Sequence, residues 1–385
     1  MSNTPKNFAE LSVALHKKYQ GKMSIASLTP IETLDDLSTI YTPGVAEPCR
    51  IIAKDKDRSF DLTWRGRTVA VISDGSAVLG LGNIGPEAAM PVMEGKCLLF
   101  KEFGGVDALP ICLDTQDTDE IVETIVRMAP SFGGINLEDI SAPRCFEIEA
   151  KLKEQLNIPI FHDDQHGTAI VVVAAMKNAL KVVNKKIEDV KIVISGAGAA
   201  GIAIAQLIMT AGGKNIVMTD SKGVIGSHRD NLNSAKQEVL AQFTRDETGD
   251  IHSAMNGADI FIGVSKAGII DKTDIEKMNK DAIVFAMANP TPEILPDEVK
   301  AGGARIVATG RSDFANQVNN VVAFPGLFAG LFAIQARSIT PDIFMVVADA
   351  IANTVENPNE ENIIPSPLNK SVAENVKQAV INFSK

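Results

Sequence analysis

Two adjacent carboxylates, Asp163 and Asp164, lie in the stretch FHDDQHGT at residues 161–168. This stretch follows a short apolar run and precedes a long apolar helical pattern that begins near Gly167. In open α/β sheets, ligands bind where strands end and helices begin. Neighbouring carboxylates raise each other's pKa unless a cation lies close by. The pair therefore predicts a bound cation; the alternative is that an aspartate caps the following helix.

More acidic residues follow apolar runs of strand type. Glu138 and Asp139 come directly after GINL at 134–137, and the carboxyl ends of parallel strands share one edge of a sheet. With one of the two aspartates above, they form a set of oxygen ligands that suits Mg²⁺ or Mn²⁺. His162 and His166 flank the aspartates, but zinc is disfavoured because thiolates and an H-E-x-x-H order are missing nearby. We expect both imidazoles to be structural hydrogen-bonding groups.

Two further side chains are candidates for acid or base. Lys96 lies in PVMEGKCLLF, an otherwise apolar helical run. Its amine either extends to the surface or is partly buried with a lowered pKa, which would suit a base. Tyr41 precedes a Pro-Gly turn in IYTPGV. Taken alone, this tyrosine indicates packing against a fixed bend rather than chemistry.

Two segments fit the G-x-G-x-x-G pattern of dinucleotide-binding loops. The first spans residues 80–85 and is loosely joined to the strand before it. The second directly follows KIVIS and opens an alanine-rich helix; it contains Gly196, Gly198, Ala199, Ala200 and Gly201. We predict that this second loop binds pyrophosphate at the helix N-terminus.

An acid follows the second loop at the spacing typical of dinucleotide-binding units. Asp220 comes nineteen residues after Gly201, at the end of the run NIVMT, where an acid bonds the ribose 2′-hydroxyl. Its charge favours NAD, because a 2′-phosphate would be repelled. Lys222 could offset that repulsion, so NADP stays an alternative. Asn289, before Pro290, and the pair Asn319-Asn320, before VVAFPG, could offer amide hydrogen bonds to nicotinamide, ribose or substrate. Asn before Pro is also a common turn, so a structural role stays an alternative.

The order of apolar runs predicts an α/β fold. Strands are expected at 68–73, 109–113, 134–137, 158–161, 191–195, 215–219, 258–264, 282–290 and 305–310, with helices between them. Such alternation is typical of parallel sheets covered by helices, and a chain of 385 residues suggests two domains. We predict an N-terminal parallel-sheet catalytic domain at 1–160, followed by a Rossmann-type dinucleotide-binding domain with C-terminal helices at 161–385.

Composition narrows the class of partner. The net charge is −11 and the chain has no prominent basic run, which argues against nucleic acid and anionic membranes. No stretch approaches the ~20 uncharged apolar residues of a membrane span. The N-terminus carries no secretory pattern, and the four cysteines are far apart. The expected location is therefore the cytoplasm.

Taken together, these motifs resemble the malic enzymes of the short bacterial type. The resemblance rests on YTPGVAEPC, DGSAVLGLGNIGPEAAMPVMEGK, NLEDI, FHDDQHGTAIV, GAGAAG, ANPTPEI and NNVVAFPG, in the family's order. It implies oxidative decarboxylation of malate to pyruvate and CO₂, with NAD reduced and with Mg²⁺ or Mn²⁺ bound. It also implies decarboxylation of oxaloacetate, and a homodimer.

The resemblance also implies roles for individual residues. Glu138, Asp139 and Asp164 would hold the metal. Lys96 would be the general base with Asp163 as its partner, and Tyr41 would be the general acid. Asn289 and Asn320 would contact substrate or the nicotinamide half of the cofactor.

The chain departs from the family pattern at one position. Large-subunit members carry a substrate-binding arginine where this chain has Ala77, so the malate carboxylates must be held in another way. Two rival functions are an oxaloacetate decarboxylase on the same scaffold and a catalytically inactive nucleotide-binding regulator. The regulator predicts loss of a metal acid, Lys96 or Tyr41, and all of these are present.

Overall fold

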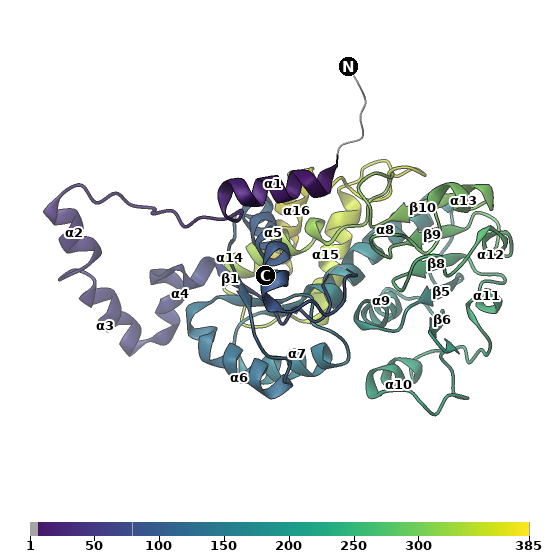
Figure 1. Cartoon of the computed structure of the whole chain (residues 1–385), viewed down its shortest axis with the longest axis horizontal. Coiled ribbons are helices and arrows are strands. Elements are labelled where there is room, and N and C mark those ends of the chain that lie inside the picture. The colour runs from purple at the N-terminus through teal and green to yellow at the C-terminus, as the bar shows by residue number, and fades with distance from the viewer. Residues whose placement is uncertain (1–6, 79, 385) are drawn as a thin grey trace, which may run out of the picture.

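Two parallel sheets, each covered by helices, form the body of the protein (Figure 1). The computed structural model describes residues 7–78 and 80–384. This architecture confirms the predicted α/β fold class with a Rossmann-type sheet in the second half.

The first sheet has four parallel strands in the order β2-β1-β3-β4. They are β1 (Thr68–Ser73), β2 (Asp107–Cys112), β3 (Gly134–Leu137) and β4 (Ile160–His162). Helices α5 (Pro86–Gly104), α6 (Thr118–Met128) and α7 (Arg144–Gln155) cover it. Strands β1, β3 and β4 are buried throughout, as expected of near-continuous apolar runs in a parallel sheet.

The register of this sheet sets the position of the acidic residues. Ile72 pairs with Leu137, and Leu137 pairs with His162. The residues that directly follow these strand ends therefore meet at one edge. Glu138 and Asp163 are among them.

The second sheet has the strand order β10-β9-β8-β5-β6-β7. Its strands are β5 (Lys191–Ser195), β6 (Asn215–Asp220), β7 (Gly223–Val224), β8 (Ile260–Gly263), β9 (Ile283–Ala286) and β10 (Ile306–Thr309). All pairs are parallel except β6 with β7. This is the Rossmann order, with the short antiparallel β7 in the outer position. The order in which the strands are added reverses between β5 and β8, and a ligand crevice is expected at this switch point.

Shorter helices complete this half of the molecule. They are α9 (Ala199–Thr210), α10 (Ser234–Leu240), α11 (Ile251–Ala254), α12 (Lys272–Glu276) and α13 (Pro296–Ala301).

Four helices connect the two sheets. They are α8 (Thr168–Val183), α14 (Phe324–Ala333), α15 (Pro341–Asn353) and α16 (Ser371–Phe383). Helix α14 packs on α5 of the first sheet, and α15 packs on α8. One continuous apolar core runs through these helices and both sheets. The domain division after residue 160 stays a prediction.

The segment Asp163–Val183 is long and apolar enough, by length and composition, to cross a membrane. It starts with two aspartates, and 72% of its most apolar window is buried inside the protein. Burial of this degree is what a core helix shows.

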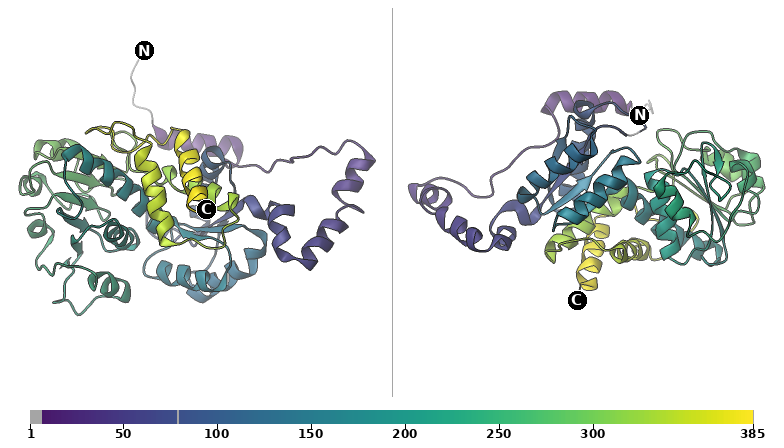
Figure 2. Two further views of the ribbon diagram at one scale, coloured as in Figure 1. Left: turned by 180° about the vertical axis from the view of Figure 1, so that it is seen from behind. Right: turned by 90° about the horizontal axis from the view of Figure 1, so that it is seen from below.

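The N-terminal part forms an extended arm. Helix α1 (Phe8–Tyr19) lies over the body, and the chain then runs outward to α2 (Leu34–Ile40) and α3 (Ala46–Lys54) before returning through α4 (Ser59–Leu62). Figures 1 and 2 show α2 and α3 standing away from both sheets. Each residue of these two helices is at least partly exposed to solvent.

Candidate active site

A tight turn joins β4 to helix α8 and carries both aspartates. Asp163–Gly167 form a single π-helical turn, a geometry found often at functional sites. The carboxylate of Asp163 lies so close to Gly167 that a Cβ there would be 2.0 Å from Asp163 Oδ1. Only glycine fits this position while Asp163 keeps its place. Neither the turn nor α8 has a side-chain N-cap, so the capping alternative for the aspartates is wrong.

Three acids converge as the sequence predicts. Ligand atoms of Glu138, Asp139 and Asp164 lie within 4.8 Å of one another. The main-chain N–H of Asp139 donates to Asp164 Oδ2 at 2.9 Å. This hydrogen bond fixes the Asp164 carboxylate beside Asp139. Asp139 itself adopts a left-handed backbone with φ of 53°. Such conformations persist where the surrounding structure holds them, often at functional sites.

The chemistry of this cluster fits a hard divalent cation. Its donors are oxygens alone, and Glu138 and Asp139 are buried. Burial raises the pKa of Glu138 well above its usual value; nearby Asp163, Asp164 and Asp139 add to this, although Lys96 opposes it. A dication would relieve that repulsion. Mg²⁺ or Mn²⁺ is therefore the group that these residues would hold.

Lys96 lies between this cluster of acids and Asp163. Its Nζ is 2.6 Å from Asp163 Oδ2 and 2.9 Å from Glu138 Oε1. Its side chain is only 11% exposed, so the alternative of a lysine that extends to the surface is wrong. Burial lowers the pKa of Lys96, but the two carboxylates outweigh burial and raise the pKa above its usual value. The expected lowering is therefore wrong for the protein without ligands.

Residues from the far end of the chain complete this pair. Asn320 donates from Nδ2 to Asp163 Oδ2 at 2.9 Å and to Thr168 Oγ1 at 3.2 Å. The ring of Phe324, the first residue of α14, lies 4.4 Å from the Lys96 ammonium. Asn320 was a sequence candidate. Phe324 was missed, because an aromatic residue in an apolar helix looks like ordinary core.

His162, which ends β4, and His166, which lies in the turn, differ in their contacts. His166 lies 2.8 Å from Glu149 Oε1 and stacks on Phe344 of α15, which confirms its structural role. Burial raises the pKa of Glu149, but His166 and Lys153 outweigh burial and hold that pKa at about 2. His162 has no hydrogen-bond partner for either ring nitrogen among residues 7–78 and 80–384. The expectation of a structural hydrogen bond is therefore wrong for His162.

Arg144, which hydrogen-bonds the loop after β1, was also missed by sequence reasoning. Arg144 Nη2 lies 2.8 Å from Asp74 Oδ2 and 3.0 Å from Ser76 Oγ. It thereby ties the loop after β1 to helix α7. In that loop, Ala77 donates its N–H to the Asp139 carbonyl at 3.0 Å, so this main-chain donor is already used within the protein.

The loop from Gly196 to Gly201 meets the steric needs of a phosphate-binding loop. A Cβ at Gly201 would lie 1.8 Å from the Gly196 carbonyl oxygen, and one at Gly196 would lie 2.8 Å from the Val264 carbonyl oxygen. Gly198 is the N-cap of α9 and provides no side-chain cap. Ala199 and Ala200 begin the helix, so their main-chain N–H groups point toward a ligand at the helix N-terminus.

The competing glycine pattern serves packing instead. A Cβ at Gly80 would lie 2.6 Å from the Asn289 carbonyl oxygen. The loop at 80–85 thus touches the end of the second sheet, where Asn289 follows β9. This contact brings the first sheet's loop next to a predicted cofactor residue.

Asp220 ends β6 as predicted, but both of its oxygens are occupied. Oδ1 accepts from the Lys222 N–H at 2.9 Å and from Arg229 Nη1 at 2.9 Å. Oδ2 accepts from Arg229 Nη2 at 3.1 Å and from Lys236 Nζ at 2.6 Å. Although burial opposes them, Arg229 and Lys236 hold the pKa of Asp220 well below its usual value. The Asp220 carboxylate is thus paired with two cationic side chains, those of Arg229 and Lys236.

Tyr41 is a site candidate that the structure does not place near Lys96 and the acids. It lies at the C-terminal end of α2 and is 67% exposed. Figures 1 and 2 place α2 far along the arm, away from the carboxyl edge of the first sheet. Within one chain, Tyr41 is therefore separate from Lys96 and the acids.

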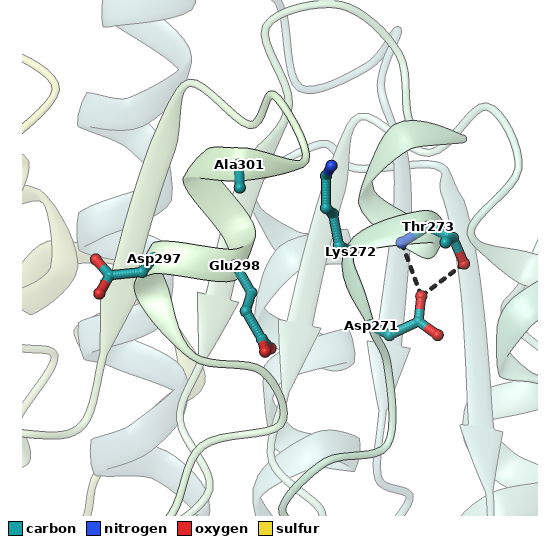
Figure 3. Close-up of a pocket in the computed structure, with 6 residues that line it drawn as sticks. All are labelled: Asp271, Lys272, Thr273, Asp297, Glu298 and Ala301. Carbon is teal, nitrogen blue, oxygen red and sulfur yellow. Dashed lines mark hydrogen bonds between the residues drawn. The ribbon is translucent and has the colours of Figure 1, made fainter.

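A surface hollow on the second half lies apart from this constellation (Figure 3). It measures about 450 Å³ and is lined by Asp271, Lys272, Thr273, Asp297, Glu298 and Ala301. Asp271 Oδ1 accepts from the Thr273 N–H and hydroxyl, as the dashed lines show, and caps α12. Asp271 and Thr273, two polar residues of this hollow, are thus engaged with each other in local structure.

Comparison with known proteins decides the family. The model of the malic enzyme N-terminal domain matches residues 20–153, and that of the malic enzyme NAD-binding domain matches residues 165–384. The chain belongs to the malic enzyme family. Malic enzymes are oxidoreductases that decarboxylate, so the predicted enzyme class is confirmed.

Individual relatives agree with this assignment. The NAD-dependent malic enzyme of Geobacillus stearothermophilus is 55% identical over 94% of this chain and 76% of its own length. The bifunctional malic/malolactic enzyme of Bacillus subtilis is 52% identical over 96% and 92%. The crystal structure of malic enzyme from Pyrococcus horikoshii superposes with a TM-score of 0.94 at 46% identity, over 98% of this chain and 90% of that one. Other malic enzyme relatives, between 44% and 48% identical, are named NADP-dependent.

Proposed function

We propose that this malic enzyme converts (S)-malate to pyruvate and CO₂ and passes the hydride to NAD⁺ or NADP⁺, with oxaloacetate as a second substrate for decarboxylation. The observation that carries the proposal is the contact of Lys96 with Asp163 and Glu138, beside three acids suited to Mg²⁺ or Mn²⁺. The carboxylate of Glu138 then contacts the base, Lys96, and is also part of the dication site.

Lys96 is the group that removes the proton from the C2 hydroxyl of malate. Asp163, fully buried, holds the amine in place, and Asn320 fixes the orientation of Asp163. The bound dinucleotide would accept the hydride from C2. The cation, held by Glu138, Asp139 and Asp164, would supply Lewis-acid stabilisation of negative charge during loss of CO₂.

A base must first lose its proton. In the protein without ligands, Asp163 and Glu138 raise the pKa of Lys96. Positive charge held by Glu138 would oppose the ammonium and lower that pKa. The shared carboxylate thus couples the readiness of the base to occupation of the metal site.

A direct assay tests this function. Purified protein with Mn²⁺, malate and either NAD⁺ or NADP⁺ should produce reduced cofactor and pyruvate. Lys96→Ala should lose about 10²–10⁴-fold in turnover, the range for a general base. Lys101→Ala is the matched control, because Lys101 lies on the same helix but is exposed. Pyruvate from oxaloacetate without reduced cofactor from malate would support the decarboxylase instead.

The charges around Asp220 bear on the choice of dinucleotide. A carboxylate accepts about four hydrogen bonds, and Asp220 already accepts from Lys222, Arg229 and Lys236. A ribose hydroxyl must therefore displace one of these donors. A 2′-phosphate would instead meet Arg229 and Lys236. We propose that the enzyme accepts both NAD and NADP, which comparison of the two KM values tests.

We also propose a homodimer in the cytoplasm in which the arm of one chain reaches the site of the other. The arm presents apolar side chains to solvent, among them Ile25, Leu28 and Leu34 at 84%, 77% and 81% exposure. A hollow of about 610 Å³ lies where the arm meets the edge strand β2. Such a surface is typical of an interface rather than of a free monomer.

Sedimentation tests the dimer. Wild-type protein should sediment as a dimer at micromolar concentration, and Leu34→Asp should shift it toward monomer. Leu368→Asp serves as a control, since Leu368 is equally exposed but lies far from the arm in the sequence. A wild-type monomer would overturn this proposal and leave the chemistry at Lys96 untouched.

A further inference from the structure

We propose that Glu293 is a positioning residue that holds together the loops receiving the nicotinamide half of the dinucleotide. Its place in ANPTPEI puts it four residues after Asn289. The proposal rests on the proposed function only in assuming that the second sheet binds NAD⁺ or NADP⁺.

Glu293 is a buried carboxylate that bridges two loops. Its Oε1 accepts the Ser265 N–H at 2.9 Å, and its Oε2 accepts the Ala288 N–H at 2.9 Å. Its relative exposure is 0%. Ser265 follows β8 and Ala288 follows β9, so one side chain fixes the carboxyl ends of two adjacent strands.

The fit of this carboxylate is close. A Cβ at Gly263, the last residue of β8, would lie 2.4 Å from the carboxyl carbon of Glu293. The strand therefore ends in glycine where the carboxylate needs room. Burial of a charge is costly unless hydrogen bonds compensate it. Glu293 is buried despite this cost, and Gly263 leaves space for its carboxylate. Both observations indicate that Glu293 does more than fill the core.

The bridge extends to the phosphate-binding loop. Ser265 Oγ lies 2.9 Å from Ser195 Oγ at the end of β5. The neighbouring Val264 carbonyl packs against Gly196 so closely that a Cβ there would be 2.8 Å away. Glu293 thus connects the loops after β5, β8 and β9. In a Rossmann sheet the dinucleotide crosses the switch point between β5 and β8, so these loops line its binding site.

The chemistry requires a carboxylate and not an amide. Both oxygens accept from main-chain N–H groups, which favours the ionised form although burial raises the pKa of Glu293. In Glu293→Gln the shape is kept, but one acceptor becomes an NH₂ donor that faces an N–H. One of the two loops is then released while the rest of the fold is kept.

Titration calorimetry tests this role through binding rather than turnover. We expect Glu293→Gln to weaken NAD⁺ binding about tenfold or more, the size expected when a buried donor loses its partner. Binding of 5′-AMP, which lacks the nicotinamide half of the dinucleotide, should change less than about twofold by the same reasoning. Glu298→Gln, an equal charge change on the exposed face of α13, should leave both affinities unchanged.

Two outcomes would overturn the proposal. The first is NAD⁺ affinity in folded Glu293→Gln within twofold of the wild type. The second is an equal loss of NAD⁺ and 5′-AMP affinity, which would indicate general damage. If the wild type bound 5′-AMP but not NAD⁺, the proposed function would fail as well, so the two failures are distinguishable.

Hydrogen exchange on the wild type keeps the proposal testable if the variant does not fold. The Ser265 and Ala288 amides should exchange slowly in the protein without dinucleotide, because Glu293 already accepts them. NAD⁺ should slow them little further, as expected of a preorganised binding site. Rapid exchange that slows only when NAD⁺ binds would contradict a preformed clamp.

Discussion

The site around Lys96 and the arm that carries Tyr41 are built in opposite ways. At Lys96, five elements converge: α5 gives the lysine, the loop after β3 gives Glu138, and the π turn gives Asp163. Asn320 and Phe324 arrive from beyond β10. The arm has helices with exposed apolar side chains and an exposed tyrosine at a helix end.

The difference shows which part of the site one chain can make. Buried ion pairs and hydrogen bonds within the chain fix Lys96, the proposed base, and the acids proposed to hold the metal. Tyr41, the proposed general acid, lies at the end of α2. This helix stands away from both sheets, and the arm around it carries exposed apolar side chains that suit an interface with a second copy. Variants in the two regions can distinguish a site that one chain completes from a site that two chains share.

Mixed dimers give the largest expected effect. Lys96→Ala and Tyr41→Phe should each be inactive alone. If the arm reaches the partner's site, a dimer with one chain of each kind contains one intact site, so about half of the activity per dimer should return. Dissociation, mixing and a malate-dependent assay measure this. If each Tyr41 served its own chain, mixing would restore nothing.

The metal site should depend on Asp164 more than on any exposed acid. Asp164→Asn removes a charged ligand, so we expect Mn²⁺ affinity to fall by about 10²-fold, at least the effect of losing an outer-shell partner. Mn²⁺ titration followed by electron paramagnetic resonance measures it. Asp230→Asn, at an exposed position, is the control. Equal affinities in both variants would remove Asp164 from the ligand set.

Gly167→Ala should disturb the site around Lys96 by displacing Asp163. The new Cβ would meet Asp163 Oδ1 at 2.0 Å, so the aspartate must move away from Lys96. We expect a loss of about 1–3 kcal/mol in stability, as for overpacking, together with lower turnover. Thermal melting and the malate assay check both. Gly95→Ala should be tolerated, because its Cβ would lie 3.4 Å from the flexible end of Lys22.

Glu149 should make a smaller, pH-dependent contribution. Its pKa falls from 4.5 to about 2 in the folded protein, so its stabilisation is complete above pH 4.5 and disappears as the pH falls toward 2. Glu149→Gln should therefore lower stability by up to about 3 kcal/mol at neutral pH. The gap from the wild type should narrow below pH 4.5. Urea melts at several pH values measure it, and a constant gap would contradict the assignment.

Sequence patterns located most of the fold because buried parallel strands are near-continuous apolar runs. The runs at 68–73, 134–137 and 191–195 match β1, β3 and β5. The run at 282–290 was too long, since β9 ends at Ala286 and the chain turns before Pro290. The strand β7 was missed because two residues carry no periodicity.

The sequence could nominate residues whose chemistry is unusual in its setting, and their roles in the site stay predictions. Paired acids at strand ends and a lysine in an apolar helix identified Asp163, Asp164 and Lys96. Arg144, Phe324 and Glu293 were missed, because their roles depend on partners far away in the sequence. The direction of the Lys96 pKa was also wrong, since burial was foreseen and the two flanking carboxylates were not weighed against it.

The return of α14 to the first sheet has a consequence for biosynthesis. Helix α5 leaves the ribosome early, but its packing partner α14 begins more than two hundred residues later. Until then, the ammonium of Lys96 lacks the ring of Phe324, and Asp163 lacks the amide of Asn320. Contacts of such long sequence separation form slowly. A nascent chain therefore cannot complete this site before α14 has been made.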